Sequence, residues 1–411
     1  MLIGNAIVGQ SGGPTAAINA TLAGVIRGAM ASECIEKIFG MRNGIEGLMN
    51  ERFIDLGEIF SDEENLKVLE QTPAAALGSC RKKLPDPNSG KKEDEEFYKK
   101  LFEILDKNNI KFFFYIGGND SMDTVAKMSI YAEKCNSDIR IMGVPKTIDN
   151  DLALTDHTPG FGSAAKYIAT TVSEIIRDCS VYTVRAVTIV EIMGRDAGWL
   201  TASSAIGRVV NGTAPDYVYL PERSFDMDSF FSDIEKAFER HPNIVIAVSE
   251  GLRFADGRYV GEGTQSGSAD VFGHKYLAGT GKALELAVKE KFGCKVRSVE
   301  LNLPQRCAGH LLSATDIRES CFIGERAVEA ATSGVSGEVM VFVRESGDGY
   351  KCSIEHRSVR NIANESRYVP DEFITAENNN VTDECCEYLL PLIAGEREIV
   401  YEGGLPKHII L

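Results

Sequence analysis

Short apolar stretches that alternate with longer helical stretches constrain the fold of this chain most. Strand-like runs lie at 2–8, 111–116, 139–144, 186–192 and 243–249. Segments with a helical apolar period follow most of them, at 15–31, 121–135, 162–179, 196–207 and 277–292. This alternation is typical of βαβ units, so the sequence predicts an α/β fold with mainly parallel sheets. In such sheets, ligands bind at the carboxyl ends of the strands.

The length of 411 residues is too great for one small core and suits two α/β lobes that share a cleft. We expect residues 1–150 to form a first lobe and residues 151–335 a second. Residues 336–411 carry no motif of their own, and we expect them to pack across the lobes. The polar stretch at 84–96 predicts a surface excursion within the first lobe.

Composition excludes several classes of function. The net charge of -16 argues against a nucleic-acid or anionic-membrane surface, which requires a positive footprint. The ten cysteines form no C-x-x-C pair and no short disulfide framework, which predicts reduced thiols and a cytoplasmic location. No stretch of about 18 apolar residues predicts a membrane span, and the first residues do not resemble a signal peptide.

Two glycine-rich loops stand between a strand and a helix. They are "GQSGGP" at 9–14 and "YIGGNDS" at 115–121. Glycines at such a place allow backbone amides to approach an anion, and the helix N-terminus adds partial positive charge. The alternatives are a tight turn for the first loop and a simple helix cap at Asn119 and Asp120 for the second.

The stretch "GVPKTIDND" at 143–151 places a lysine and two carboxylates at the end of a buried strand. Asp149 and Asp151 are two residues apart, so both can face one cleft. Carboxylate oxygens suit Mg²⁺, and phosphoryl transfer uses a base beside the attacking hydroxyl. A run of Asp and Asn is more often a turn, but a turn does not require Lys146 and Thr147 beside it.

Further charged residues follow later strands or turns. Arg195 lies in "MGR", Glu250 in "SEG", and Arg81 in "GSCR". Arg297 and Arg306 are nine residues apart in "VRSVELNLPQR". Each arginine alone is more often a surface or salt-bridge residue than a ligand.

These motifs, taken in this order, resemble those of the phosphofructokinase family, whose members phosphorylate the 1-hydroxyl of fructose 6-phosphate. The resemblance covers about residues 1–335. It implies the phosphofructokinase fold of two Rossmann-like lobes, with the phosphoryl donor on the first and the sugar phosphate mainly on the second. It also implies homodimers or homotetramers with sites near the interfaces.

The family pattern also implies roles for individual residues. Asp149 is expected to be the base and Thr147 to line the site at the attacking oxygen. Asp151 is expected to act on the metal-bound phosphates. Met193, Gly194 and Arg195 are expected to contact the sugar phosphate, and Glu250 a sugar hydroxyl. Arg297 and Arg306 are expected to clamp the phosphate of the sugar. The expected donor contacts are Gly12, Gly13, Arg81, Asp120 and Lys146.

The residue after Gly-Gly-Asn and the residue before Thr-Ile-Asp indicate the phosphoryl donor. In the ATP-using branch of the family both are glycine, whereas here they are Asp120 and Lys146, which resembles the pyrophosphate-dependent branch. An Asp120 carboxylate repels a third phosphate, while Lys146 supplies charge to the transferred phosphoryl group. Mg²⁺ is the expected cofactor, with Asn119, Asp120 and Asp151 as candidate ligands. Asn119 departs from the family, which has a metal-binding Asp there.

Three alternatives remain for the function. An ATP-dependent phosphofructokinase would require space at position 120. A non-catalytic subunit of the same fold should have lost the base, whereas Asp149 is present. A lipid or NAD kinase shares a similar glycine loop but does not explain "PKTIDND" or "MGR".

Overall fold

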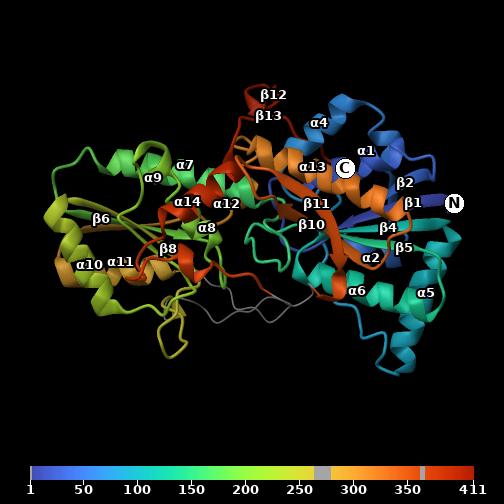
Figure 1. The fold of residues 1–411 in the computed structure, drawn as a ribbon, viewed down its shortest axis with the longest axis horizontal. Coiled ribbons are helices and arrows are strands. Elements are labelled where there is room, and N and C mark those ends of the chain that lie inside the picture. Colours follow the sequence, from blue (N-terminus) through green and yellow to red (C-terminus); the bar gives the residue numbers. More distant parts are fainter. Residues whose placement is uncertain (1, 263–278, 362–365) are drawn as a thin grey trace.

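The alternating strands and helices form two lobes that lie side by side in the computed structural model (Figure 1). The structure describes residues 2–262, 279–361 and 366–411. Each lobe is built on one sheet, and most neighbouring strands in both sheets are parallel. The predicted α/β class with mainly parallel sheets is therefore confirmed.

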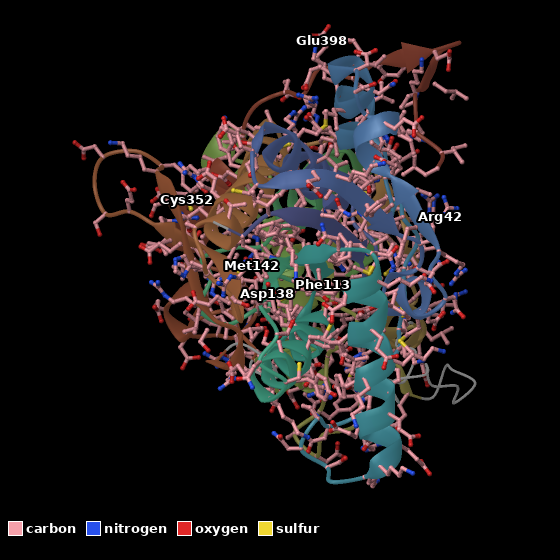
Figure 2. The ribbon with its side chains drawn as sticks, turned by 90° about the vertical axis from the view of Figure 1, so that its right-hand side faces the viewer. Arg42, Phe113, Asp138, Met142, Cys352 and Glu398 are labelled. Atoms are coloured by element: carbon pink, nitrogen blue, oxygen red, sulfur yellow. The ribbon has the colours of Figure 1, made fainter. Side chains whose placement is uncertain are left out.

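The first lobe contains a seven-stranded sheet with the order β11-β10-β5-β4-β1-β2-β3. Only its outermost pairs, β10 with β11 and β2 with β3, are antiparallel. The strands are β1 Gly4–Gln10, β2 Ile35–Met41, β3 Phe53–Asp55, β4 Ile110–Gly117, β5 Arg140–Pro145, β10 Glu338–Arg344 and β11 Cys352–Ser358. Figure 2 looks onto this lobe, with Phe113 and Met142 near its middle and Arg42 and Cys352 on opposite sides.

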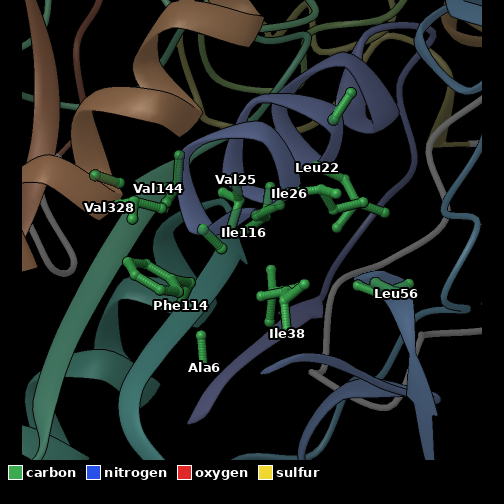
Figure 3. Close-up of a cluster of buried hydrophobic side chains, with 14 of the residues drawn as sticks. Ala6, Leu22, Val25, Ile26, Ile38, Leu56, Phe114, Ile116, Val144 and Val328 are labelled. Atoms are coloured by element: carbon green, nitrogen blue, oxygen red, sulfur yellow. The ribbon is translucent and has the colours of Figure 1, made fainter. Parts of the chain in front are cut away.

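Helices cover both faces of this sheet because its central strands are apolar on both sides. Phe112 and Phe114 of β4 pack with α1 and α13 in one core cluster, which Figure 3 shows around Phe114, Val25 and Val328. Phe113 and Tyr115 pack with α5 and α6 on the other face. The helices of this lobe are α1 Ile18–Ala31, α2 Gly44–Met49, α3 Leu56–Ile59, α4 Glu63–Gln71, α5 Lys92–Lys107, α6 Asn119–Lys134 and α13 Ala314–Thr332.

The second lobe contains a four-stranded parallel sheet with the order β7-β8-β6-β9. The strands are β6 Ala186–Ile192, β7 Tyr217–Tyr219, β8 Asn243–Ser249 and β9 Lys295–Glu300. The helices are α7 Phe161–Cys179, α8 Trp199–Ser203, α9 Gly207–Asn211, α10 Met227–Arg240, α11 Thr280–Phe292, α12 Pro304–Cys307 and α14 Asp383–Leu389. The predicted single helix at 196–207 is instead two short helices, α8 and α9. The hydroxyls of Ser203 and Ser204 bond carbonyls three residues earlier and compete with the helical pattern there.

The chain returns to the first lobe directly after α12. The sequence instead predicted that the second lobe continues to residue 335. Helix α13 packs along α1, and β10 then pairs with β5 in the first sheet. Later, Cys385 and Cys386 of α14 enter the core of the second lobe. Sequence could not reveal this exchange, because α13 and β10 have the apolar pattern of either lobe.

The remaining elements are short and lie in the last part of the chain. They are the 3₁₀ turns Val359–Asn361, Asp371–Phe373 and Leu390–Ile393 and the small hairpin β12 Tyr401–Glu402 and β13 Leu405–Pro406. Gln71 of α4 holds this end of the chain, because its amide donates to the carbonyls of Val400 and Lys407. In the described parts of the chain, no helix combines the length and the apolar character needed to cross a membrane.

Glycines allow α1 and α13 to pack closely. A Cβ on Gly24 would lie 1.9 Å from the carbonyl oxygen of Cys321, and a Cβ on Gly324 would lie 2.4 Å from that of Thr21. Real side chains do not approach a backbone oxygen this closely, so the contact requires glycine on both helices.

We predict that Gly24→Ala lowers the free energy of unfolding by about 1–3 kcal/mol, because the added methyl group forces the two helices apart. Alanine is the better helix former, so propensity alone would predict the opposite sign. Gly57→Ala in α3 is the control, because its added Cβ would meet its nearest neighbour only at 3.5 Å. Urea unfolding of the two variants measures the difference. Equal stability of Gly24→Ala and the unmodified protein would contradict the prediction.

Candidate active site

A cleft of about 830 Å³ lies between the lobes, and both contribute to its lining. From the first lobe, the loops after β1, β4 and β5 reach it with Gly12, Asn119 and Lys146. From the second lobe, the loops after β6 and β8 reach it with Arg195 and Glu250. The carboxyl ends of parallel strands from both sheets therefore meet at one place, as expected for a ligand site.

The glycines of the loop after β1 leave the backbone uncovered next to two cationic side chains. Gly12 has φ +80, and a Cβ there would lie 3.5 Å from Nζ of Lys146. A Cβ on Gly13 would lie 3.7 Å from Nη1 of Arg306. The Oγ of Ser79 donates to the Gly12 carbonyl at 2.6 Å, which fixes the turn that carries Arg81 beside this loop. Gly12, Gly13 and Arg81 all line the cleft.

Lys146 is buried at the centre of the cleft, where only 3% of the residue is exposed. Its backbone N–H donates to the Gly117 carbonyl at 2.9 Å, and its ammonium donates to the Gly13 carbonyl. Burial lowers the pKa of Lys146 to about 8, although the carboxylates of Asp149 and Asp151 oppose this shift. The ammonium is therefore a buried charge near neutral pH, placed directly against the glycine loop.

The two carboxylates of the TIDND segment line the same cleft. The Asp149 N–H donates to Oγ1 of Thr147 at 3.1 Å, and the Thr158 hydroxyl donates to the Thr147 carbonyl at 2.8 Å. Burial raises the pKa of Asp149, and burial together with the Asp149 charge raises the pKa of Asp151 to about 7. A carboxylate with a raised pKa beside an amine with a lowered pKa suits proton transfer near neutral pH.

The second lobe presents its polar groups through a turn that requires glycine. Gly194 has φ +123, and its carbonyl accepts a hydrogen bond from Oγ of Ser249 at 2.6 Å. Its N–H donates to Oε1 of Glu250 at 3.4 Å. Burial and the charge of Asp149 raise the pKa of Glu250 to about 8. Met193, Arg195 and Glu250 line the cleft from this side.

The first lobe also offers oxygen atoms suited to a hard cation. The Oδ1 of Asn119 is buried and accepts no hydrogen bond from the described residues. Asp120 and Asp151 line the same cleft, and Asp120 forms an ion pair of 3.5 Å with Lys83. An orphaned buried carbonyl oxygen close to carboxylates fits Mg²⁺, which prefers hard oxygen ligands.

Two of the residues predicted for the site are not among those that line the cleft. Gly194 contributes through its backbone turn. Arg297 lies on β9, the edge strand of the second sheet, and its side chain is exposed. The prediction that Arg297 contacts the sugar phosphate therefore has no support within a single chain. Arg306 does line the cleft, but it reaches as far as the glycine loop of the first lobe.

The structure adds cleft residues that the sequence did not single out. Gln305 accepts the Met193 N–H at 3.2 Å and so braces the turn before Arg195. Glu191 lines the cleft, accepts the Gly281 N–H at 2.6 Å and has its pKa raised by burial to about 7. The position of Glu191 at the end of an apolar strand could have indicated a site residue in the sequence. Lys83, Asp196 and Glu300 also line the cleft, but nothing in their local sequence separates them from surface charges.

Comparison with known proteins identifies this combination of fold and cleft. The phosphofructokinase family model matches residues 5–331. The chain belongs to the phosphofructokinase family. The match covers both lobes and the loops that line the cleft, including the TIDND, MGR and SEG segments.

Individual phosphofructokinase relatives match nearly the whole chain. The chain is 39% identical over 414 residues to the pyrophosphate–fructose 6-phosphate 1-phosphotransferase of Xanthomonas campestris pv. campestris, with 100% of this chain and 97% of that protein covered. It is 38% identical over 408 residues to the protein of the same name from Halomonas elongata, covering 98% and 95%. The crystal structure of the pyrophosphate-dependent phosphofructokinase from Nitrosospira multiformis matches with a TM-score of 0.86 and 34% identity, covering 98% and 95%.

The raised pKa of Asp151 in this phosphofructokinase site predicts a pH-dependent cost to stability. Because the folded-state pKa of about 7 exceeds the unfolded value of about 3.9, the folded protein binds the extra proton between these values and loses stability as pH rises. We predict that Asp151→Asn raises the free energy of unfolding by about 1–3 kcal/mol at pH 8, with a smaller gain at pH 5.

Urea unfolding between pH 5 and pH 8 measures this gain. Asp348→Asn is the control, because Asp348 is an exposed aspartate outside the cleft. A gain from Asp151→Asn that stays the same at every pH would show that Asp151 does not titrate in this range.

Proposed function

We propose that this protein transfers a phosphoryl group from pyrophosphate to the 1-hydroxyl of fructose 6-phosphate in an Mg²⁺-dependent reaction. The products are fructose 1,6-bisphosphate and phosphate, and we expect the reaction to run in both directions in glycolysis. The observation that carries the proposal is the buried Lys146 ammonium against the glycine loop. The full-length relatives named for this activity support the same donor.

The donor side of the cleft favours pyrophosphate over ATP. Asp120 lies in the first turn of α6, and its carboxylate lines the cleft with Lys83 as its ion-pair partner. A negative charge there repels a third phosphate and the nucleoside beyond it. Lys146 and Arg81 remain to neutralise the two phosphates of the smaller donor. A bound Mg²⁺, held by Asn119 and Asp120 with Asp151 nearby, would offset further charge on the phosphates.

The chemistry assigned to the chain centres on Asp149. Its carboxylate accepts the proton of the sugar 1-hydroxyl as that oxygen attacks the terminal phosphoryl group. Thr147 fixes the backbone that carries this carboxylate, because its hydroxyl accepts the Asp149 N–H. Lys146 and Arg306 supply positive charge at the glycine loop, where negative charge spreads over the phosphoryl oxygens. Met193, Arg195 and Glu250 hold the sugar phosphate from the second lobe.

We also propose a homo-oligomer and a cytoplasmic location. Arg297 is exposed on the open edge of the second sheet. Arg297 could therefore contact a sugar phosphate only if that sugar phosphate is bound in the cleft of another copy of the chain. An assembly that joins these edges would explain why a residue of the family motif faces away from the cleft of its own chain.

The decisive experiment compares initial rates on fructose 6-phosphate and Mg²⁺ with pyrophosphate or ATP as donor. We expect turnover with pyrophosphate and a rate with ATP lower by at least about 10²-fold. Asp120→Gly with Lys146→Gly should weaken the use of pyrophosphate. Asp123→Gly is the control for a glycine in this helix, because Asp123 lies one turn later in α6 and outside the cleft. A rate with ATP alone would overturn the donor assignment, and no rate with either donor would favour a non-catalytic subunit.

We predict that Asp149→Ala lowers kcat by about 10²–10⁴-fold, because the attacking hydroxyl loses its base. The KM for fructose 6-phosphate should change much less, because the sugar is held by the second lobe. Steady-state kinetics with pyrophosphate measure both constants, and urea unfolding checks that the variant is folded. A kcat within a few-fold of the unmodified protein would remove Asp149 from the role of base.

A further inference from the structure

A second buried charged cluster lies outside the cleft, on the segment that joins the TIDND loop to α7. His157 is at its centre with only 2% of the residue exposed. Its Nδ1 lies 2.9 Å from Oδ2 of Asp156, and its Nε2 lies 2.9 Å from Oε2 of Glu319 on α13. The imidazole also stacks on Phe342 of β10, with ring centroids 4.3 Å apart and an interplanar angle of 3°. This cluster therefore joins the loop to two elements of the first lobe.

The geometry favours the doubly protonated form of this histidine. A carboxylate only accepts hydrogen bonds, so both ring nitrogens must carry a proton when both carboxylates are ionised. His157 is then an imidazolium between Asp156 and Glu319. The bonds to these two carboxylates raise its pKa, although burial opposes the shift.

The other charged and titratable groups around the cluster are consistent with this assignment. Arg344 of β10 pairs with Asp156 at 3.1 Å, so two positive groups balance two negative ones. Tyr388 of α14 donates to Oδ1 of Asp156 at 2.7 Å, and Tyr350 donates to Oε1 of Glu319 at 2.9 Å. Burial raises the pKa of the Cys352 thiol to about 12, so this group stays neutral near His157. Burial also raises the pKa of Asp316, whose carboxylate accepts the N–H groups of Gly160 and Ser163.

A short chain of hydrogen bonds connects this cluster to the base. Thr158 follows His157 directly, and its hydroxyl donates to the Thr147 carbonyl at 2.8 Å. The Thr147 hydroxyl in turn accepts the Asp149 N–H at 3.1 Å. On the other side of His157, the Asp156 N–H donates to the Phe342 carbonyl at 2.9 Å. Fixing His157 therefore fixes the backbone that sets the position of the Asp149 carboxylate.

We propose that His157 is a positioning residue: as an imidazolium held by Asp156 and Glu319, it anchors the loop that carries Asp149 to the first lobe. It contacts no reacting atom, because it is not among the residues that line the cleft. Its effect on turnover rests on the proposed function, whereas its protonation state and its effect on stability do not. A loop held in one place keeps the base within reach of the attacking hydroxyl.

A bound metal is the competing explanation for the same side chains. Ligand atoms of His157, Glu319 and Cys352 all lie within 4.8 Å of one another. A transition metal there would displace the proton on Nε2 and the thiol proton of Cys352. The 2.9 Å contact between Nε2 and Glu319 matches a hydrogen bond, so we favour the proton.

The first test uses ¹⁵N-labelled histidine in the full-length protein and follows the ring nitrogens by NMR as pH rises. We expect both nitrogens of His157, assigned by comparison with His157→Gln, to give imidazolium shifts at pH 7.5. Glu319→Gln removes one carboxylate and should lower the pH at which this signal titrates. A neutral ring at pH 7.5, or a stoichiometric transition metal in the purified protein, would overturn the proposal. The test requires no substrate and stands even if the donor assignment fails.

The second test measures kcat and KM of His157→Gln with pyrophosphate and fructose 6-phosphate. We expect kcat to fall by about 10–100-fold, because a base displaced by about 1 Å loses its alignment. Both KM values should change by less than about threefold, because the cleft lining is intact. His241→Gln is the control, since His241 has one carboxylate partner, Asp216, and is exposed in the second lobe. An unchanged kcat for a folded His157→Gln would overturn the positioning role.

The pH dependence of stability provides a third readout. The folded-state pKa of His157 is raised, so its contribution to stability is fully present below the unfolded value of about 6.5 and is lost as pH rises through the folded value. We expect the loss of stability in that range to be smaller in His157→Gln than in the unmodified protein. The same pH dependence in both would contradict the imidazolium.

Discussion

The segment from Lys146 to Gly160 is the constraint on which the rest of the molecule depends, because it joins the two lobes and also carries Asp149 and Asp151, which line the cleft. It leaves β5 of the first sheet and enters α7 of the second lobe. Asp316 of α13 holds its far end by accepting the N–H of Gly160 at 2.9 Å. A movement of one lobe against the other would therefore displace the loop that carries Asp149 and Asp151. This explains why the loop is anchored so densely.

The cleft brings buried basic and acidic side chains close together in a protein that is acidic overall. Lys146 is buried beside Asp149 and Asp151, and none of these groups could be ionised there alone without a large desolvation cost. Burial lowers the pKa of Lys146 to about 8 and raises that of Asp151 to about 7, and it also raises the pKa of Asp149. The same arrangement explains why composition was a poor guide to the site, since the overall charge of -16 does not reveal that Lys146, Arg81 and Arg306 line one cleft together with its carboxylates.

The sequence predicted most of the site residues that follow strands. It predicted little of the structure that depends on the chain returning to the first lobe after the second. The glycine loop, Lys146 and the TIDND carboxylates were recognisable, because strand-to-helix turns place such residues at the edge of a parallel sheet. The assignment of α13 and β10 to the first lobe was not, because their apolar patterns suit either core. Gln305 was missed for a related reason, since its contact with the Met193 backbone depends on how α12 folds back.

His157 is a further residue whose role could not be predicted from the sequence. In sequence it is a single histidine eight residues after Asp149, and its partner Glu319 is separated from it by 162 positions. Only the return of α13 to the first lobe brings the second carboxylate to its ring. The same return of the chain brings β10 into the first sheet and Glu319 to the ring of His157, beside the loop that carries Asp149. Loss of the α1–α13 contact would act on both, so fold stability and loop position are linked through one helix.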